Sequence, residues 1–331
     1  MHRVYNVAQV SHLYKTLLNA LTTGKECSII MHTWSPGLWN AFRSFESVLR
    51  DSGLFKQVLL AGCFRNGFRG RLYNDNEMKA IATLIPDHCE LVCFNWNEQL
   101  LFDPNFRLLR KARNITLVED AATISPSSAT LAKRLAMRAA FGERVLAPSS
   151  TVDNVYVTET QHYLRTFGQS RVHPIIEFTQ PKAMTTENLE YIKDVFDCPT
   201  PSNAGAGTII LTQPLANDIK RATVAEQIAI YQAIIDRFPS PVFLKKHPRD
   251  DIIYPFSDEV QEISRFTPQE LITELGFHFE YAVGLSSTAI EATNSINKVM
   301  IYPEIYEHWD AAQVLRLIEE FPLEDKTVAI L

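Results

Sequence analysis

Short apolar runs alternate with segments of helical periodicity along much of the chain. In the first half, four runs have the length and composition of buried strands, and residues 38–49 carry apolar side chains at helical spacing. Because strands that alternate with helices build βαβ units, this half is predicted to form a parallel α/β sheet. The four strand-like runs lie at residues 27–32, 56–61, 90–95 and 115–118.

The second half shows the same alternation more regularly. Apolar runs and segments of helical spacing follow one another in the order expected of a second α/β sheet domain. The predicted strands are residues 208–212, 241–245, 279–284 and 298–302, and the predicted helices are residues 224–238, 268–275, 287–295 and 309–320.

The periodic pattern weakens between these two halves. Residues 198–207 read CPTPSNAGAG, and proline, serine, asparagine and glycine are typical of linkers. We therefore predict three parts of the chain. They are an N-terminal Rossmann-like domain over residues 1–180, a linker over residues 181–206 and a C-terminal Rossmann-like domain over residues 207–331.

Composition narrows the class of protein. The 331 residues are 46% hydrophobic and 21% charged, which is typical of a globular protein and excludes collagens, coiled coils and disordered chains. The net charge of −6 disfavours a nucleic-acid binder, because such proteins neutralise phosphates with basic residues. No apolar run reaches about 18 residues and the N-terminus does not resemble a secretory signal, so a cytoplasmic location is predicted.

The cysteines predict neither disulfides nor a metal site. Their number is odd, no CxxC motif occurs, and several lie within apolar strand-like runs. We interpret them as buried, reduced thiols, because a zinc site requires a cluster of cysteine and histidine that the sequence lacks. They are Cys27, Cys63, Cys89, Cys93 and Cys198.

A basic segment follows the predicted strand at residues 241–245. Lys246 and His247 belong to a positive cluster in an acidic chain, and Pro248 stops the strand from continuing. Ligands of open α/β sheets bind beyond the carboxyl ends of strands. These residues therefore suit an anionic phosphate, which the cations hold while His247 donates to a leaving oxygen. The alternative is a solvated basic loop.

Small hydroxyl residues follow the predicted strand at residues 279–284. Ser286, Ser287 and Thr288 precede a predicted helix, and serine is a preferred N-cap. Backbone N–H groups at such a helix start bind phosphate, so these residues are candidate phosphate contacts. The alternative is a plain helix cap.

Carboxylates follow two further predicted strands. Glu119 and Asp120 come directly after residues 115–118, and neighbouring like charges can raise one pKa and produce a base near neutrality. Asp218 comes shortly after Gln213 and Pro214, where another strand ends. The alternatives are helix-capping acids for the adjacent pair and a turn aspartate for Asp218.

Several common motifs are missing from the sequence. No GxGxxG, P-loop, GxSxG or HExxH motif occurs, so a glycine-rich phosphate cradle is not available. No Asp-x-Asp pair is present to hold a divalent metal against a diphosphate. A nucleotide with a single phosphate would not demand such a metal.

Together these motifs resemble those of the bacterial sialyltransferases, a group that includes lipooligosaccharide sialyltransferases and capsule polysialyltransferases. The group shares an Asp/Glu-Asp/Glu-Gly motif, a His-Pro motif and a Ser-Ser/Thr motif. Glu119-Asp120, His247-Pro248 and Ser286-Ser287 match these in the same order, although Ala121 stands where the group has glycine. Residues 212–215, which read TQPL, and the later Lys-x-His-Pro-Arg are most similar to the lipooligosaccharide branch.

The resemblance implies an α/β fold of GT-B type, in which two Rossmann-like domains face a central cleft and the C-terminal domain binds the donor. It implies an inverting, metal-independent and cofactor-independent transfer of sialic acid from CMP-sialic acid to a terminal sugar, often galactose, on a glycolipid. The implied base is Asp120, with Glu119 next and Asp218 in reserve, and His247 would serve the leaving phosphate. The implied substrate contacts are Lys246, Pro248, Ser286, Ser287, Thr288, Gln213 and Pro214.

A glycolipid acceptor would bring the protein to the inner face of the bacterial membrane. Candidate contacts are the basic run at residues 107–113 and the pair Lys133-Arg134, which are alternatively solvated helix faces. Related enzymes can be dimeric, so a homodimer remains open.

Other functions also remain open. A polysialyltransferase, or a Kdo or hexose transferase, would share the fold, and the nucleotide that inhibits the reaction would separate them. A non-catalytic nucleotide- or sugar-binding protein would bind CMP without transfer. A phosphatase-like enzyme or an epimerase that uses the histidine would act without an acceptor.

Overall fold

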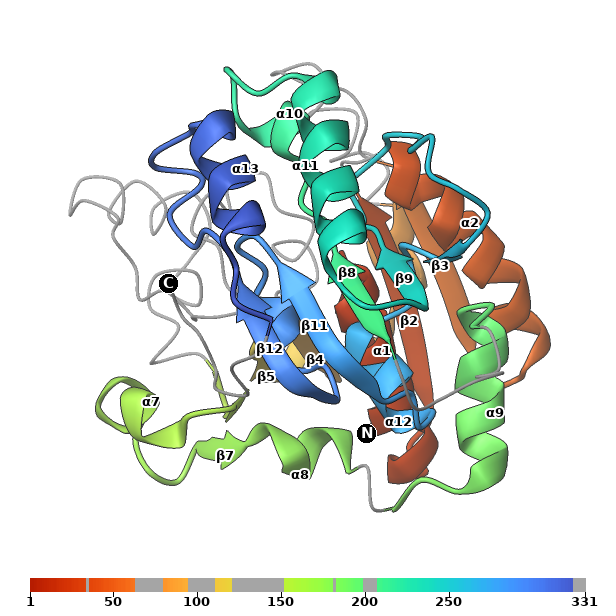
Figure 1. Cartoon of the computed structure of the whole chain (residues 1–331). Helices are drawn as coiled ribbons and strands as arrows, with labels where there is room; N and C mark the ends of the chain where they lie inside the picture. Colours follow the sequence, from red (N-terminus) through yellow and green to blue (C-terminus); the bar gives the residue numbers. More distant parts are fainter. Residues whose placement is uncertain are drawn as a thin grey trace. The chain divides into compact units, whose positions relative to one another are not determined.

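The computed structural model describes residues 1–33, 36–62, 80–94, 111–120, 152–180, 183–198 and 207–323. The chain divides into two compact units, Met1–Val195 (unit 1) and Phe196–Leu331 (unit 2). Each unit is built around a parallel β-sheet, as the sequence predicts; Figure 1 draws the first from red to green and the second from green to blue.

Unit 1 contains a seven-stranded parallel sheet with the order β3-β2-β1-β4-β5-β6-β7. Every residue of β1, β2 and β4 is buried, as expected of central strands that are covered on both faces. The strands are β1 (Arg3–Val7), β2 (Cys27–Thr33), β3 (Gln57–Gly62), β4 (Cys89–Phe94), β5 (Ala112–Val118), β6 (Asn154–Val157) and β7 (Val172–Pro174).

The helices described in unit 1 are α1 (Val10–Thr23), α2 (Pro36–Asp51), α7 (Thr160–Phe167), α8 (Ile175–Thr179) and α9 (Thr186–Val195). Helix α1 ends at Gly24, whose left-handed backbone (φ 59°) is typical of a helix C-cap. Helix α9 lies inside the segment that the sequence suggests is a linker. It buries Ile192 and Val195, and it contacts α1 and α2, so this part of the segment is folded onto unit 1.

Unit 2 contains a five-stranded parallel sheet with the order β10-β9-β8-β11-β12. Its strands are β8 (Thr208–Leu211), β9 (Val242–Lys245), β10 (Val260–Ile263), β11 (Phe279–Gly284) and β12 (Ser295–Met300). Its described helices are α10 (Leu215–Asp218), α11 (Val224–Arg237), α12 (Gln269–Glu274) and α13 (Ala311–Glu319). Helices α11 and α13 pack together over one face of the sheet, and α12 packs on the other face.

Both sheets contain a point at which the strand order reverses. In unit 1 the chain moves outward from β1 to β3 and then returns to place β4 on the other side of β1. In unit 2 it moves from β8 to β10 and then returns to place β11 beside β8. Ligands of open parallel sheets bind in the crevice outside the carboxyl ends of strands at such a reversal. A ligand site is therefore expected at the ends of β1 and β4 in unit 1 and at the ends of β8 and β11 in unit 2.

The prediction of a helix over residues 287–295 is wrong. Only a short 3₁₀ turn, Thr288–Ile290, is present, and the edge strand β12 already begins at Ser295. The Cδ1 methyl group of Ile290 packs directly over Gly284, where an added Cβ would lie 2.9 Å from it. This contact turns the chain back across the sheet end, and the Thr293 hydroxyl donates to Ala289 O at 3.0 Å.

Candidate functional site

Three loops of unit 2 carry predicted site residues at the carboxyl edge of the sheet. Gln213 follows β8, His247 follows β9 and Ser286 follows β11, so two of the three loops flank the reversal between β8 and β11. Parallel pairing of these strands brings their carboxyl ends to the same edge. The predicted phosphate-binding residues therefore share the edge at which such sheets bind ligands.

The protein backbone determines which nitrogen of His247 carries a proton. Nδ1 accepts the backbone N–H of Arg249 at 3.1 Å, so the neutral ring carries its proton on Nε2. Burial, together with the positive charges of Arg249 and Lys245, lowers the pKa of His247 to about 4. At neutral pH the ring is therefore an uncharged donor through Nε2–H.

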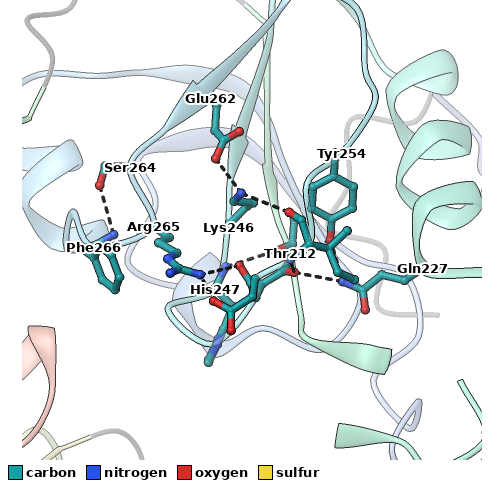
Figure 2. A network of polar contacts seen from close by, with 12 residues as sticks. Thr212, Gln227, Lys246, His247, Tyr254, Glu262, Ser264, Arg265 and Phe266 are labelled. Carbon is teal, nitrogen blue, oxygen red and sulfur yellow. Dashed lines mark hydrogen bonds and ion pairs between the residues drawn. The ribbon is translucent and has the colours of Figure 1, made fainter. Parts of the chain in front are cut away.

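A buried carboxylate positions the loop that carries His247. The backbone N–H of His247 donates to Thr212 Oγ1 at 3.1 Å, and the Thr212 hydroxyl donates to Asp250 Oδ2. Asp250 is fully buried and also accepts from the Tyr254 hydroxyl at 2.7 Å and from Gln227. Thr212, Gln227 and Tyr254 lie close together in Figure 2, where the dashed lines follow this network. Asp250 thus links the ends of β8 and β9.

The two lysines before the histidine have different surroundings. Lys246 forms an ion pair with Glu262 at 2.9 Å and donates to Ile252 O (Figure 2). Lys245 is 8% exposed, and burial lowers its pKa to about 8. Its charge acts on His247, whereas no such effect comes from Lys246. Side chains alternate along a strand, so the two-residue spacing of Lys245 and His247 was the available signal for this pairing.

The other predicted residues of unit 2 are held by the protein itself. Asp218 accepts two bonds from the Arg249 guanidinium, at 2.7 and 2.8 Å, which is a bidentate ion pair. Ser286 donates to Pro303 O at 3.0 Å, and the Gln213 side chain accepts from the Tyr306 hydroxyl at 2.9 Å.

The remaining residues of these loops have backbone roles. Pro214 precedes α10 and its carbonyl accepts the N–H groups of Asn217 and Asp218. Ser287 is buried and its carbonyl accepts from Ile290 N, while Thr288 opens the 3₁₀ turn. Because this turn spans three residues, the helix start expected to bind phosphate is not formed here. Pro248 follows His247 in the turn that Asp250 N closes on His247 O.

The two adjacent carboxylates of unit 1 have separate surroundings. Glu119 is 7% exposed and accepts the backbone N–H of Thr158 at 2.6 Å and the Tyr163 hydroxyl at 3.4 Å. These bonds connect the end of β5 to β6 and α7, so the role of the Glu119 side chain is structural. Asp120 instead faces the first turn of α1, and Lys15 of α1 donates to both carbonyls, Glu119 O and Asp120 O.

Asp120 is paired with a buried histidine. Its Oδ1 lies 3.0 Å from His12 Nε2 and 3.4 Å from the Ser11 hydroxyl, and its Oδ2 accepts from the Gln9 amide at 3.0 Å. The His12 N–H is not aimed straight at the oxygen, so this contact is an electrostatic pairing rather than an aligned hydrogen bond. Burial favours the protonated acid, but His12 and Lys15 outweigh it and lower the pKa of Asp120. The carboxylate is therefore ionised at neutral pH.

One family model matches the part of the chain that carries the acidic, His-Pro and Ser-Ser motifs. The model for glycosyltransferase family 52 matches residues 108–302, which include the acidic pair, His247 and Ser286. The chain belongs to glycosyltransferase family 52. This is the family of the bacterial lipooligosaccharide α-2,3-sialyltransferases, as the resemblance indicates. No curated protein shows significant similarity to the chain.

Solved structures extend the comparison to the fold of this family 52 protein. The UDP-GlcNAc 2-epimerase of Methanocaldococcus jannaschii, in complex with UDP-GlcNAc and UDP, is 11% identical with a TM-score of 0.52, over 99% of this chain and 94% of the epimerase chain. A second structure of that epimerase is 12% identical (TM-score 0.49; 99% and 94% covered). A glycosyltransferase from Rickettsia africae is 12% identical (TM-score 0.39; 96% and 87% covered). The first of these confirms the predicted α/β fold of GT-B type.

The contribution of α1 was not predicted from the sequence of this family 52 protein. The Asp120 segment is contacted by Gln9, which is the N-cap of α1, and by Ser11, His12 and Lys15 within α1. The available signal was a set of polar residues at helical spacing, but the preceding segment RVYNV contains Arg3 and Asn6 and is not a clear strand pattern.

The structure of this family 52 protein also bears on the predictions for cysteines, metal ligands and membrane spans. The four described cysteines are buried, as predicted, and burial raises the pKa of Cys27 and of Cys89 to about 11. No group of three or more metal-ligating side chains occurs among the residues that the structure covers. Within those residues no helix is long and apolar enough to cross a membrane. Some predictions concern residues outside the described part of the chain, namely Cys63, Ala121, Lys133-Arg134 and residues 107–110.

Proposed function

We propose that this glycosyltransferase moves sialic acid from CMP-sialic acid to a terminal sugar, galactose of a lipooligosaccharide being the expected acceptor. The single observation that carries the proposal is the state of His247. Its Nε2–H is an uncharged donor at the carboxyl edge of the unit 2 sheet, with two cations acting on it. A phosphate that gains negative charge as it leaves is the species that such a site stabilises best.

The reaction assigned to these residues has a simple balance. The acceptor hydroxyl forms a bond to the anomeric carbon of sialic acid while the bond from that carbon to the CMP phosphate breaks. The hydroxyl proton passes to a carboxylate, and the electron pair of the broken bond leaves with CMP. Attack from the face opposite the phosphate inverts the anomeric centre.

His247 and the neighbouring cations are assigned to the leaving phosphate. A hydrogen-bond donor that is already in place when charge develops contributes roughly 3–4 kcal/mol to the transition state. The positive charges of Lys245 and Arg249, both of which act on His247, add to this effect. This charge supports a reaction without a divalent metal, which the proposal includes.

Asp120 is assigned as the base. It is ionised at neutral pH, and its Oδ2 contacts only the amide of an exposed glutamine among the hydrogen bonds of the described residues. Glu119 is engaged by Thr158 N and Tyr163, and Asp218 is engaged by Arg249. Both are therefore weaker candidates. Proton transfer to a positioned carboxylate typically contributes roughly 10²–10⁴-fold in rate.

The proposal is tested by CMP release from CMP-sialic acid, with and without a β-galactoside acceptor, in EDTA. Acceptor-stimulated release is the expected result, and His247→Ala is expected to lower kcat strongly without loss of folding. His278→Ala, at a half-buried position of unit 2, is the matched control. If neither CMP release nor CMP binding is measurable, the sialic acid donor is wrong. Release that ignores the acceptor would indicate hydrolysis or epimerisation instead.

A further inference from the structure

The first turn of α1 and the end of β5 form a polar cluster that the family motifs do not include. His12 lies in α1, outside the matched residues 108–302, and is 2% exposed. Its ring stacks on Phe94 at the end of β4, with a centroid distance of 4.6 Å and an interplanar angle of 11°. A buried imidazole in a fixed orientation therefore lies beside the Asp120 carboxylate, next to the strand reversal of unit 1.

The contacts of His12 exclude it as the base. Its Nδ1 accepts the backbone N–H of Ala8 at 3.2 Å, which leaves the neutral ring with its proton on Nε2. That nitrogen faces Asp120 Oδ1 at 3.0 Å. Neither ring nitrogen remains to take a proton from an acceptor hydroxyl, so any action of His12 on the reaction passes through Asp120.

The two oxygens of Asp120 are used differently. Oδ1 lies between His12 and the Ser11 hydroxyl, which are both part of α1. Oδ2 has the amide of Gln9, an exposed residue, as its partner. A substrate hydroxyl can displace an exposed amide far more easily than a buried ring, so Oδ2 is the oxygen available to accept a proton.

We propose that His12 is the positioning residue of the base: it holds Oδ1 of Asp120 so that Oδ2 is presented, ionised, to the acceptor hydroxyl. The inference rests on the proposed function, because Asp120 is the base only if the chain transfers a sugar. The other charged or titratable groups that face the pair in the described part of the chain are Lys15 of α1 and His32 of β2. Each stays in place in the test below.

The central variant is His12→Phe, which keeps an aromatic ring on Phe94 and removes Nε2. We expect kcat to fall about 10- to 100-fold, because misplacing a reacting group by about 1 Å costs up to about 100-fold. The KM for CMP-sialic acid should change less than about twofold, since the donor is assigned to unit 2. The acid limb of the kcat/KM profile should move to higher pH, because burial raises the pKa of Asp120 once His12 no longer opposes it.

Control variants separate positioning from folding. His12→Gln offers an amide N–H to Asp120 and is expected to recover part of the lost kcat, which a packing role alone would not predict. His162→Phe, at an exposed histidine of α7, should leave kcat and the pH profile unchanged. If His12→Phe does not fold, the NMR measurement of the histidines carries the test. Wild-type kcat and an unshifted acid limb in folded His12→Phe would overturn the proposal.

A measurement that does not depend on activity separates this inference from the proposed function. Nitrogen-15 NMR of labelled histidine should show the His12 proton on Nε2, and Asp120→Asn should shift that signal more than signals of other histidines. A proton on Nδ1, or no response to Asp120→Asn, would overturn the inference. If the wild type transfers no sialic acid yet shows the expected signals, the proposed function fails while the pairing stands.

Discussion

Thr212 Oγ1 accepts the backbone N–H of His247 at 3.1 Å and donates its own hydrogen to Asp250, which is fully buried. The loop that follows β9 is therefore held to the end of β8 by a hydroxyl whose orientation a carboxylate determines. The position of His247 depends on this one side chain as much as on the proline that follows it.

Thr212→Val should separate loop position from packing. The substitution keeps the side-chain shape but removes one of the donors to the Asp250 carboxylate and leaves the His247 N–H without its partner. We expect a loss of about 1–3 kcal/mol in the free energy of unfolding and a clear fall in kcat. Thr267→Val is the matched control, because Thr267 has an equally buried hydroxyl with no hydrogen-bond partner in the described part of the chain. Urea unfolding and steady-state kinetics of both variants provide the comparison.

Asp120→Asn and Glu119→Gln should differ sharply. The first removes the assigned base and should lower kcat by roughly 10²–10⁴-fold with a normal melting temperature. The second keeps an oxygen that can accept from Thr158 N, so kcat should stay within about threefold of the wild type. A large loss in the Gln variant together with an active Asn variant would transfer the base to Glu119.

His32 makes stability depend on pH in a predictable direction. Burial lowers the pKa of His32 from 6.5 to about 4. Between these values the unfolded chain binds a proton that the folded chain does not, so the free energy of unfolding falls as the pH decreases from 6.5 to 4. One such group contributes a slope of up to about 1.4 kcal/mol per pH unit. His12 and His247, whose pKa values are also lowered, act in the same direction.

The contribution of His32 can be isolated by His32→Leu. Chemical unfolding measured between pH 7 and pH 4.5 should show a shallower decline for this variant than for the wild type. His162→Leu, at an exposed position, is the control. An unchanged slope in the His32 variant would mean that this ring is protonated in the folded protein.

Gly207→Ala should be among the most destabilising substitutions in unit 2. Gly207 has a φ of +110°, and an added Cβ would lie 2.1 Å from the Pro241 carbonyl oxygen, a backbone atom that cannot rotate away. Gly276 also has a positive φ, of +85°, but has open space around it. Gly276→Ala should therefore cost only the conformational strain of about 1–2 kcal/mol, and Gly207→Ala clearly more. Equal losses in thermal unfolding would contradict the steric argument.

The sequence predicted those strands whose side chains are almost all apolar. It did not reveal β1, because Arg3 and Asn6 interrupt the pattern; Arg3 is buried with its guanidinium bonded to Glu90, at 2.7 Å, and to Asn19. Strand β10 was missed for a related reason, since it lies at the sheet edge and exposes Gln261 and Glu262. Contacts that compensate a buried charge come from distant parts of the chain, and local periodicity does not report them.

The same limit applies to the candidate site, where local sequence predicts positions but not long-range contacts. The sequence predicts that His247 and Asp120 lie at strand ends, because proline or charged residues after an apolar run mark the end of a strand. The partners of the site residues could not be predicted, because each pair is far apart in the sequence. Arg249 binds Asp218, and His12 pairs with Asp120. Choosing between Lys245 and Lys246 needed the side-chain direction along β9, which the position of the strand end determines.

The placement of β1 has a consequence for synthesis on the ribosome. This strand is made before both of its neighbours, and it pairs with β2 on one side and with β4 on the other. Until residues 89–94 leave the ribosome, one edge of β1 has only solvent, or another nascent chain, to pair with. Open strand edges are the usual templates for intermolecular pairing. The yield of correctly folded protein should therefore depend on how soon translation delivers β4.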